Sequence, residues 1–206
     1  MSTNGPVDGA SGDSLVEFLA VMRRLRAECP WKREQTHRSL ARYLLEEAHE
    51  TLEALDTGSA DHLREELGDL LLQIYFHAVI AEETGDFTID DVAREITEKM
   101  VRRNPHVFGD GSADPADARA VNELWESVKA AEKQRDSVTD GIAPTLPALL
   151  YADKVLDRLD RAGAAPVLSG DDLGDRLLAL VAEARESGTD PEQALRDAVR
   201  RLVADA

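Results

Sequence analysis

The apolar residues of this chain recur with the spacing of α-helices along most of its length. Positions 15, 18, 19, 22 and 25 form one apolar stripe of a first helix, which Pro30 ends. After a loop or short turn over residues 31–38, the same spacing predicts further helices, approximately over residues 39–56, 60–84, 88–104, 115–128, 146–162, 171–187 and 190–204. The pattern therefore predicts an all-α protein.

Loop-forming residues divide the chain into segments. Residues 1–13 are rich in Gly, Ser and small polar residues, which predicts a disordered tail. Residues 136–147 contain one Gly and two Pro residues and predict a linker. We therefore expect a first helical domain over residues 14–135 and a helical C-terminal unit over residues 148–206. Within the first domain, Ser39 is the expected N-cap of its helix, and Pro115 is an expected first helical residue.

The charge balance is strongly acidic. The 206 residues include 41 Asp and Glu but only 24 Lys and Arg, for a formal net charge of −17. Such a chain is not expected to bind a nucleic-acid polymer or an anionic membrane. A nucleotide is compatible with it, provided that a metal ion and a local basic cluster offset the phosphates. The single cysteine, Cys29, together with the lack of a secretion signal or a membrane-spanning segment in the sequence, predicts a cytoplasmic protein.

Two predicted helices carry acidic residues on faces that should pack together. Their connection, Asp56-Thr57-Gly58-Ser59, predicts a turn and hence an antiparallel helix pair. The first helix carries Glu46, Glu47 and Glu50. At 100° per residue, Glu47 falls in the middle of an apolar stripe, whereas Glu46 turns toward the polar side. This stripe consists of Leu40, Leu44, Ala48, Thr51 and Leu55.

The second helix is apolar around most of its circumference. Its remaining polar strip holds Glu66, Asp69, Gln73 and His77. Carboxylates that converge at a helix–helix seam repel each other and are costly to desolvate. A hard divalent cation such as Mg²⁺ resolves this conflict, because it prefers oxygen ligands. The acids therefore predict a metal site, and the alternative is a solvated acidic face.

Basic and aromatic residues suggest where phosphates would bind. Lys99 and Arg103 are four residues apart on one helical face, with Arg102 beside them, and this group is suited to clamping phosphate oxygens. The alternative is a solvated basic helix end that complements the helix dipole. Trp125 and Lys129 are also four residues apart; on sequence alone they could equally be a core Trp with an extended Lys beside it.

The arrangement of these residues resembles the MazG-type nucleoside triphosphate pyrophosphohydrolases of the all-α NTP pyrophosphatase superfamily. The central motif is Glu46-Glu47-x-x-Glu50 followed by Glu66-x-x-Asp69. The resemblance extends over residues 14–150. Further matching segments are Cys29-Pro30-Trp31, Gln35-Thr36-His37, the run from Arg102 to Phe108, and Trp125-Glu126-x-Val128-Lys129.

This resemblance implies a four-helix bundle that hydrolyses nucleoside triphosphates to monophosphate and pyrophosphate. The implied cofactor is Mg²⁺, with Mn²⁺ as a substitute, and the implied assembly is a homodimer or higher homo-oligomer. The expected metal ligands are Glu47, Glu50, Glu66 and Asp69. The expected catalytic residues are Glu46, which would orient or deprotonate the water, and the phosphate-binding Lys99, Arg103 and Lys129. The expected substrate contacts are Trp31, Arg102 and Trp125. One departure is Lys32, which stands where the family commonly has Asp.

The C-terminal unit contains a faint internal repeat. Asp172-Leu173-Gly174-Asp175 echoes Glu66-Leu67-Gly68-Asp69, but no counterpart of the upstream acids precedes it. We interpret residues 148–206 as a degenerate second repeat that binds no catalytic metal. An unrelated helical tail is the alternative.

Several functional alternatives stay open at this point. The enzyme could clean the nucleotide pool or control stress nucleotides, or act narrowly on dUTP, dCTP or damaged nucleotides. The chain could also be a non-catalytic helical module whose acids bind a structural cation. Among the histidines we see no metal-binding spacing. His77 would either support the metal ligands or be a satisfied core histidine, and we favour the core role.

Overall fold

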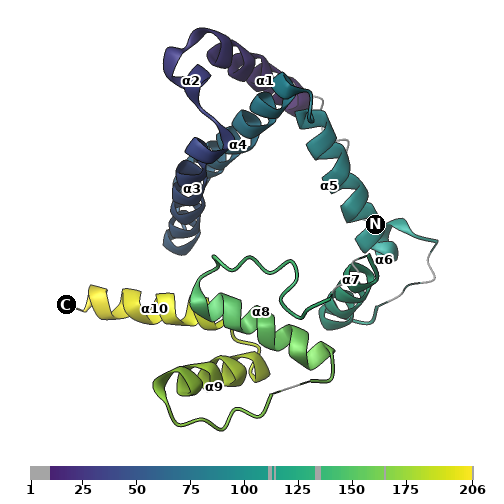
Figure 1. Cartoon of the computed structure of the whole chain (residues 1–206), viewed down its shortest axis with the longest axis vertical. Coiled ribbons are helices and arrows are strands. Elements are labelled where there is room, and N and C mark those ends of the chain that lie inside the picture. Colours follow the sequence, from purple (N-terminus) through teal and green to yellow (C-terminus); the bar gives the residue numbers. More distant parts are fainter. Residues whose placement is uncertain (1–9, 111–112, 114, 133–135, 165, 206) are drawn as a thin grey trace, which may run out of the picture. The chain divides into compact units, whose positions relative to one another are not determined.

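The computed structural model describes residues 10–110, 113, 115–132, 136–164 and 166–205 (Figure 1). Every regular element in this part of the chain is a helix, and it contains no strand, which confirms the all-α fold class. By their internal contacts the residues form two units, Met1–Trp125 and Glu126–Ala206. The predicted domain boundary at residue 135 stays a prediction. Of the described helices, none is long and apolar enough to cross a bilayer.

The first unit is organised around one long helix. Its helices are α1 (Ala10–Glu28), α2 (Pro30–Glu34), α3 (His37–Thr57), α4 (Ala60–Thr84), α5 (Ile89–Arg103) and α6 (Pro105–Phe108). Helix α4 packs against α1, α3 and α5, and α3 and α4 lie side by side along much of their length (Figure 1). Helix α7 (Ala118–Glu132) crosses the boundary between the two units.

Local capping determines where α3 and α4 begin and end. Thr36, not Ser39 as predicted, is the N-cap of α3. Its hydroxyl accepts from the Ser39 amide at 3.1 Å, and the Ser39 hydroxyl accepts from the Thr36 amide at 2.9 Å. Gly58 ends α3 with a φ of 71°, a conformation that favours glycine, and Ser59 caps α4. These signals fix the tight turn that makes α3 and α4 antiparallel neighbours.

The core of the first unit joins α1, α3 and α4. Its buried residues are Met22, Leu40, Tyr75, Phe76, Val79 and Ile80. Arg26 fastens the segment around Trp31 to this core. Its guanidinium donates to the carbonyl oxygens of Lys32 and Gln35 and pairs with Glu83 at 2.7 Å. Because Arg26 is itself largely buried, these bonds hold α2 against the end of α1.

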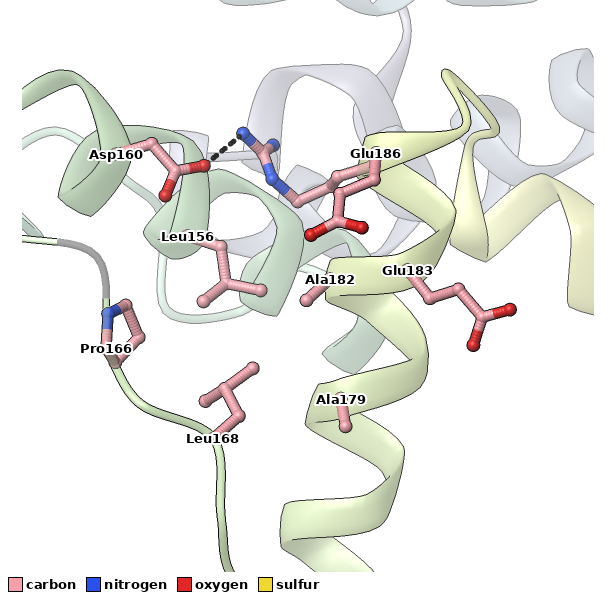
Figure 2. A pocket seen from close by; sticks show the side chains of 9 residues that line it. Leu156, Asp160, Pro166, Leu168, Ala179, Ala182, Glu183 and Glu186 are labelled. Carbon is pink, nitrogen blue, oxygen red and sulfur yellow. Dashed lines mark hydrogen bonds and ion pairs between the residues drawn. The ribbon is translucent and has the colours of Figure 1, made fainter.

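In the described part of the second unit, three helices that follow α7 pack on one another. They are α8 (Ala148–Arg161), α9 (Leu173–Glu186) and α10 (Pro191–Ala204). Arg185 of α9 forms ion pairs with Asp153, Asp157 and Asp160 of α8. A pocket of about 500 Å³ lies beside these pairs, with Leu156, Leu168 and Ala182 on its apolar wall (Figure 2). Every residue that lines it belongs to the second unit.

Three local predictions differ from the structure. Helix α1 begins at Ala10, inside the segment predicted as a disordered tail, and residues 1–9 lie outside the described part of the chain. Pro115 does not begin a helix. Instead, α7 begins at Ala118, where the Asp117 carboxylate accepts from the Ala120 amide at 2.8 Å. A short helix, α2, replaces part of the loop predicted over residues 31–38.

The structure gives a local explanation for the repeated acidic motif of the second unit. Asp172 is the N-cap of α9, and its carboxylate accepts from the Asp175 amide at 2.9 Å. Glu66, its counterpart in the sequence echo, lies inside α4 and not at its start. The capping role is therefore a sufficient reason for an Asp at position 172, and the proposed repeat stays a prediction.

Candidate active site

The face of α3 that packs on α4 contains Glu47. The buried residues of α3 are Leu40, Thr51 and Ala54, and Glu47 lies between them at helical spacing. The predicted apolar stripe was only partly correct, because Leu44 and Leu55 are 38% and 56% exposed. Among the described helices only α4 lies alongside α3, and the leucines that flank the contact are left partly exposed. The prediction that Glu47 faces the seam is consistent with this packing.

A threonine hydroxyl connects the two helices at the level of the acids. The Thr51 hydroxyl lies 2.8 Å from the carbonyl oxygen of Glu47 and 3.4 Å from that of Glu66. Thr51 is buried, so this polar contact is shielded from water. The contact fixes the register in which the acids of α3 and α4 face each other.

Three of the four predicted metal ligands converge at this seam. One carboxylate oxygen from each of Glu47, Glu66 and Asp69 lies within 4.8 Å of the others. Burial raises the pKa of Glu47, and the charges of Asp69, Glu50 and Glu66 raise it further, together with a hydrogen bond to Glu50. Glu50, the fourth predicted ligand, is therefore close enough to Glu47 to influence its protonation.

The chemistry of this donor set fits a hard divalent cation. All donors are carboxylate oxygens, and they come from two helices that are fixed relative to each other. Burial and the neighbouring charges of Asp69, Glu50 and Glu66 raise the pKa of Glu47, so its ionised form is disfavoured at this position. A bound divalent cation would favour the ionised carboxylates. Exposed Glu46 lies outside the three converging carboxylates.

His62 is a neighbour of this cluster that the sequence analysis missed. Its Nε2 lies 3.2 Å from Oε1 of Glu66, and the Glu66 side chain is only 12% exposed. The two residues are four apart on α4, a spacing that could have signalled the contact.

The predicted phosphate-binding residues lie on α5 and α7. Lys99 Nζ is 3.8 Å from Glu95 Oε1, and Lys129 Nζ is 2.7 Å from Glu126 Oε1. Arg102 is exposed, whereas Arg103 is buried and lies over the ring of Trp125, 5.4 Å from its centroid. Among the described elements α5 packs on α4 and α6 but not on α3. Their roles in binding phosphate stay predictions.

Trp31 offers an accessible aromatic face near α3. Its side chain is 48% exposed, and its ring meets that of Tyr43 edge-on at a centroid distance of 6.0 Å. Lys32, the residue that departs from the family pattern, lies over the rings of Trp31 and Phe76, at 5.5 Å and 5.2 Å from their centroids. Lys32 therefore has a packing role in this chain.

The interpretation of His77 as a core histidine with satisfied hydrogen bonds is only partly correct. Its Nδ1 lies 2.7 Å from Nδ1 of His37, but its Nε2 is buried without a hydrogen-bond partner among the described residues. Burial lowers the pKa of His77, and the neighbouring His37 lowers it further. The Oε1 atom of Gln73, one turn away, is also buried and unpaired.

The fold and site define an all-α protein with a carboxylate cluster between two antiparallel helices, suited to a divalent cation. A family model described as the MazG nucleotide pyrophosphohydrolase domain matches residues 35–108, which include every acid of the cluster. The chain is 38% identical to the Thermotoga maritima nucleoside triphosphate pyrophosphohydrolase/pyrophosphatase MazG, over 91% of this chain and 82% of that protein. It is 37% identical to an Escherichia coli nucleoside triphosphate pyrophosphohydrolase, over 88% of this chain and 81% of that protein.

A Mycobacterium tuberculosis nucleoside triphosphate pyrophosphohydrolase is more similar in sequence but longer. The identity is 48% over 81% of this chain, and the match spans about half, 51%, of that protein. Together these similarities show that the chain belongs to the MazG nucleotide pyrophosphohydrolase family. The family predicted from the sequence is confirmed.

Proposed function

We propose that this chain hydrolyses nucleoside triphosphates to nucleoside monophosphate and pyrophosphate in a reaction that depends on Mg²⁺. The observation that carries this proposal is the convergence of Glu47, Glu66 and Asp69 within 4.8 Å in a chain of the MazG family. Clustered carboxylates without a cation would repel the phosphates of the substrate. The same cluster with a cation becomes a binding site for them.

The acids of the seam would hold the cation. The proposed ligands are Glu47, Glu50, Glu66 and Asp69. When bound, the cation supplies charge compensation for the phosphates and makes a water molecule a better nucleophile at neutral pH. Glu46, which is exposed and adjacent to Glu47, is our candidate for orienting that water and accepting its proton.

The cationic side chains would stabilise the negative charge that moves onto the leaving pyrophosphate. Arg103, Lys99 and Lys129 are the proposed groups, with Arg102 as a further phosphate contact. Trp31 and Trp125 would contact the nucleoside, because base stacking tolerates different bases. Lys129 would exchange its present partner, Glu126, for a phosphate oxygen.

We propose that the active form is a homodimer. Helices of the first unit leave large apolar side chains between about one third and two thirds exposed in the single chain. On α3 these residues are Leu44, Leu45, Leu52 and Leu55, and on α5 they are Val92, Ile96 and Val101. Apolar surface of this extent is typical of an interface between subunits. A second copy would cover α3 and could complete the site with its own basic residues.

The proposed role is removal of unwanted nucleotides from the cytoplasmic pool. The decisive experiment measures pyrophosphate release from canonical and modified triphosphates, with Mg²⁺, with Mn²⁺ and with chelator. We expect release that requires the cation and extends over several bases. If one base alone supports hydrolysis, the enzyme has a narrow specificity. If no nucleotide is hydrolysed, the chain is a helical module with a structural cation and the proposal is wrong.

A further inference from the structure

The start of α4 places a histidine against the most buried acid of the cluster. Ser59 caps α4, and its hydroxyl oxygen accepts from the backbone amide of His62 at 3.3 Å. His62 is therefore fixed in the first turn of the helix. Its side chain extends along the helix to Glu66, four residues later, where Nε2 and Oε1 are 3.2 Å apart.

Glu66 needs such a neighbour because of its position. The residue is only 9% exposed, and its backbone carbonyl faces the buried Thr51 hydroxyl of α3. A carboxylate that is so little solvated keeps a single orientation only where a donor holds one of its oxygens. Among the described residues, His62 is the basic group in contact with this carboxylate.

We propose that His62 is a positioning residue for the metal site. In this role Nε2, which lies 3.2 Å from Oε1 of Glu66, would carry the ring proton and direct it at that oxygen, so that the carboxylate keeps an oxygen facing Glu47 and Asp69. The inference rests on the proposed function only in that it needs a cation at these acids. His62 itself is neither a ligand nor a proton donor to the substrate in this role. Residues that orient metal ligands commonly affect metal affinity by about 10–100-fold.

The geometry also identifies which ring nitrogen of His62 makes the contact with Glu66. Nε2 is the ring nitrogen that meets Glu66, and the His62 side chain is 39% exposed, so its Nδ1 side can be solvated. A glutamine at position 62 places its amide N–H₂ group close to where Nε2 lies, whereas a leucine fills similar space without a donor. These two substitutions therefore separate the donor from the packing.

The experiment measures Mn²⁺ binding to the full chain by calorimetry, in the absence of nucleotide and at constant pH. We expect His62→Leu to weaken Mn²⁺ binding about 10–100-fold and His62→Gln to stay within about threefold of the wild type. The control variant is Arg64→Leu, which removes a largely exposed ion pair with Asp61 in the same region of α4 and should leave binding unchanged.

The outcomes distinguish this inference from the proposed function. If the wild type and His62→Leu bind Mn²⁺ equally well, His62 forms only a surface contact and the inference is wrong. If both His62 variants lose binding equally, the histidine ring acts through its shape or as a ligand, which also contradicts the inference. If the wild type binds Mn²⁺ but releases no pyrophosphate from any nucleotide, the proposed function fails while the role of His62 is still decided by the binding data.

Discussion

The guanidinium of Arg103 lies over the indole of Trp125, 5.4 Å from the ring centroid, and only 8% of Arg103 is exposed. Two residues that the sequence singled out separately, one on α5 and one on α7, therefore contact each other. A planar guanidinium can stack on an aromatic face and still direct N–H groups at a phosphate, which an ammonium group does less well.

This contact makes Arg103 sensitive to a substitution that preserves charge. We expect Arg103→Lys to lower kcat/KM at least about tenfold, because lysine lacks the planar, forked guanidinium. Arg94→Lys, at an exposed position of the same helix where Arg94 pairs with Asp91, is the matched control and should change kcat/KM less than about threefold. Steady-state kinetics with a preferred triphosphate test this prediction. If Arg103→Lys has no larger effect than this control, the guanidinium of Arg103 is not required.

The acids of the seam should be required for activity but not for folding. Glu50→Gln removes one charge next to Glu47 while preserving the size of the side chain. We expect it to lower kcat at least about 100-fold at a fixed Mg²⁺ concentration, with circular dichroism unchanged. Glu53→Gln, an exposed acid of the same helix, is the control and should retain activity. Full hydrolysis by the Glu50 variant would show that the acids are not catalytic.

The raised pKa of Glu47 predicts how stability depends on pH in the metal-free protein. A folded-state pKa above the ordinary 4.5 means that the folded chain binds more protons than the unfolded chain between these two pKa values. Stability is therefore lost as the pH rises through this window, and the cost persists at neutral pH. We expect Glu47→Gln to raise Tm by about 2 °C at pH 7.5 with chelator and to have no effect below pH ~4.

Thermal unfolding with Mg²⁺ provides the complementary measurement. Added Mg²⁺ should raise the Tm of the wild type, because a ligand that binds only the folded state stabilises it. It should not raise the Tm of Glu47→Gln. A destabilised Glu47→Gln protein at pH 7.5 in chelator would contradict the proposed repulsion among the acids.

Helical periodicity was sufficient to find the seam and its acids. The spacing of Glu47 within apolar residues of α3, and of Glu66 and Asp69 within α4, does not depend on distant contacts. The stops at Gly58 and Gly85 are likewise local signals, because both are C-caps with positive φ. The antiparallel pair and the convergence of three carboxylates therefore followed from the sequence.

Other features depend on tertiary partners that a helical wheel does not reveal. Leu44 and Leu55 were placed in the packed stripe, yet they are exposed, because α4 is the only described helix that lies alongside α3. The pairing of His37 with His77 joins residues that are far apart in sequence, and no pattern within either helix indicates it. Thr36 was missed as an N-cap because the reciprocal bond with Ser39 makes either residue a reasonable candidate.

The side chain of Gln73 allows a test of whether a buried oxygen without a hydrogen-bond partner lowers the stability of the folded protein. This side chain is 4% exposed, and Oε1 has no partner among the described residues. Replacement by leucine removes this oxygen at similar volume, so we expect Gln73→Leu to stabilise the metal-free protein by about 1 kcal/mol, or about 2–4 °C in Tm. Differential scanning calorimetry measures the change. A lower Tm would mean that the amide is satisfied by ordered water in solution.

The exposed leucines of α3 provide a test of the homodimer. Leu45 is 62% exposed in the single chain, where a Leu45→Glu substitution on a solvated helix face should change stability by less than about 0.5 kcal/mol. In a dimer interface the same substitution would bury a carboxylate without a partner, which is strongly unfavourable. We therefore expect size-exclusion chromatography with light scattering to show a dimer for the wild type and a monomer for Leu45→Glu.

The control is Val16→Glu on α1, at a position that is 68% exposed and lies outside the proposed interface, and it should remain dimeric. A monomeric wild type at micromolar concentration would rule out the dimer, and a dimeric Leu45→Glu variant would move the interface away from this face of α3.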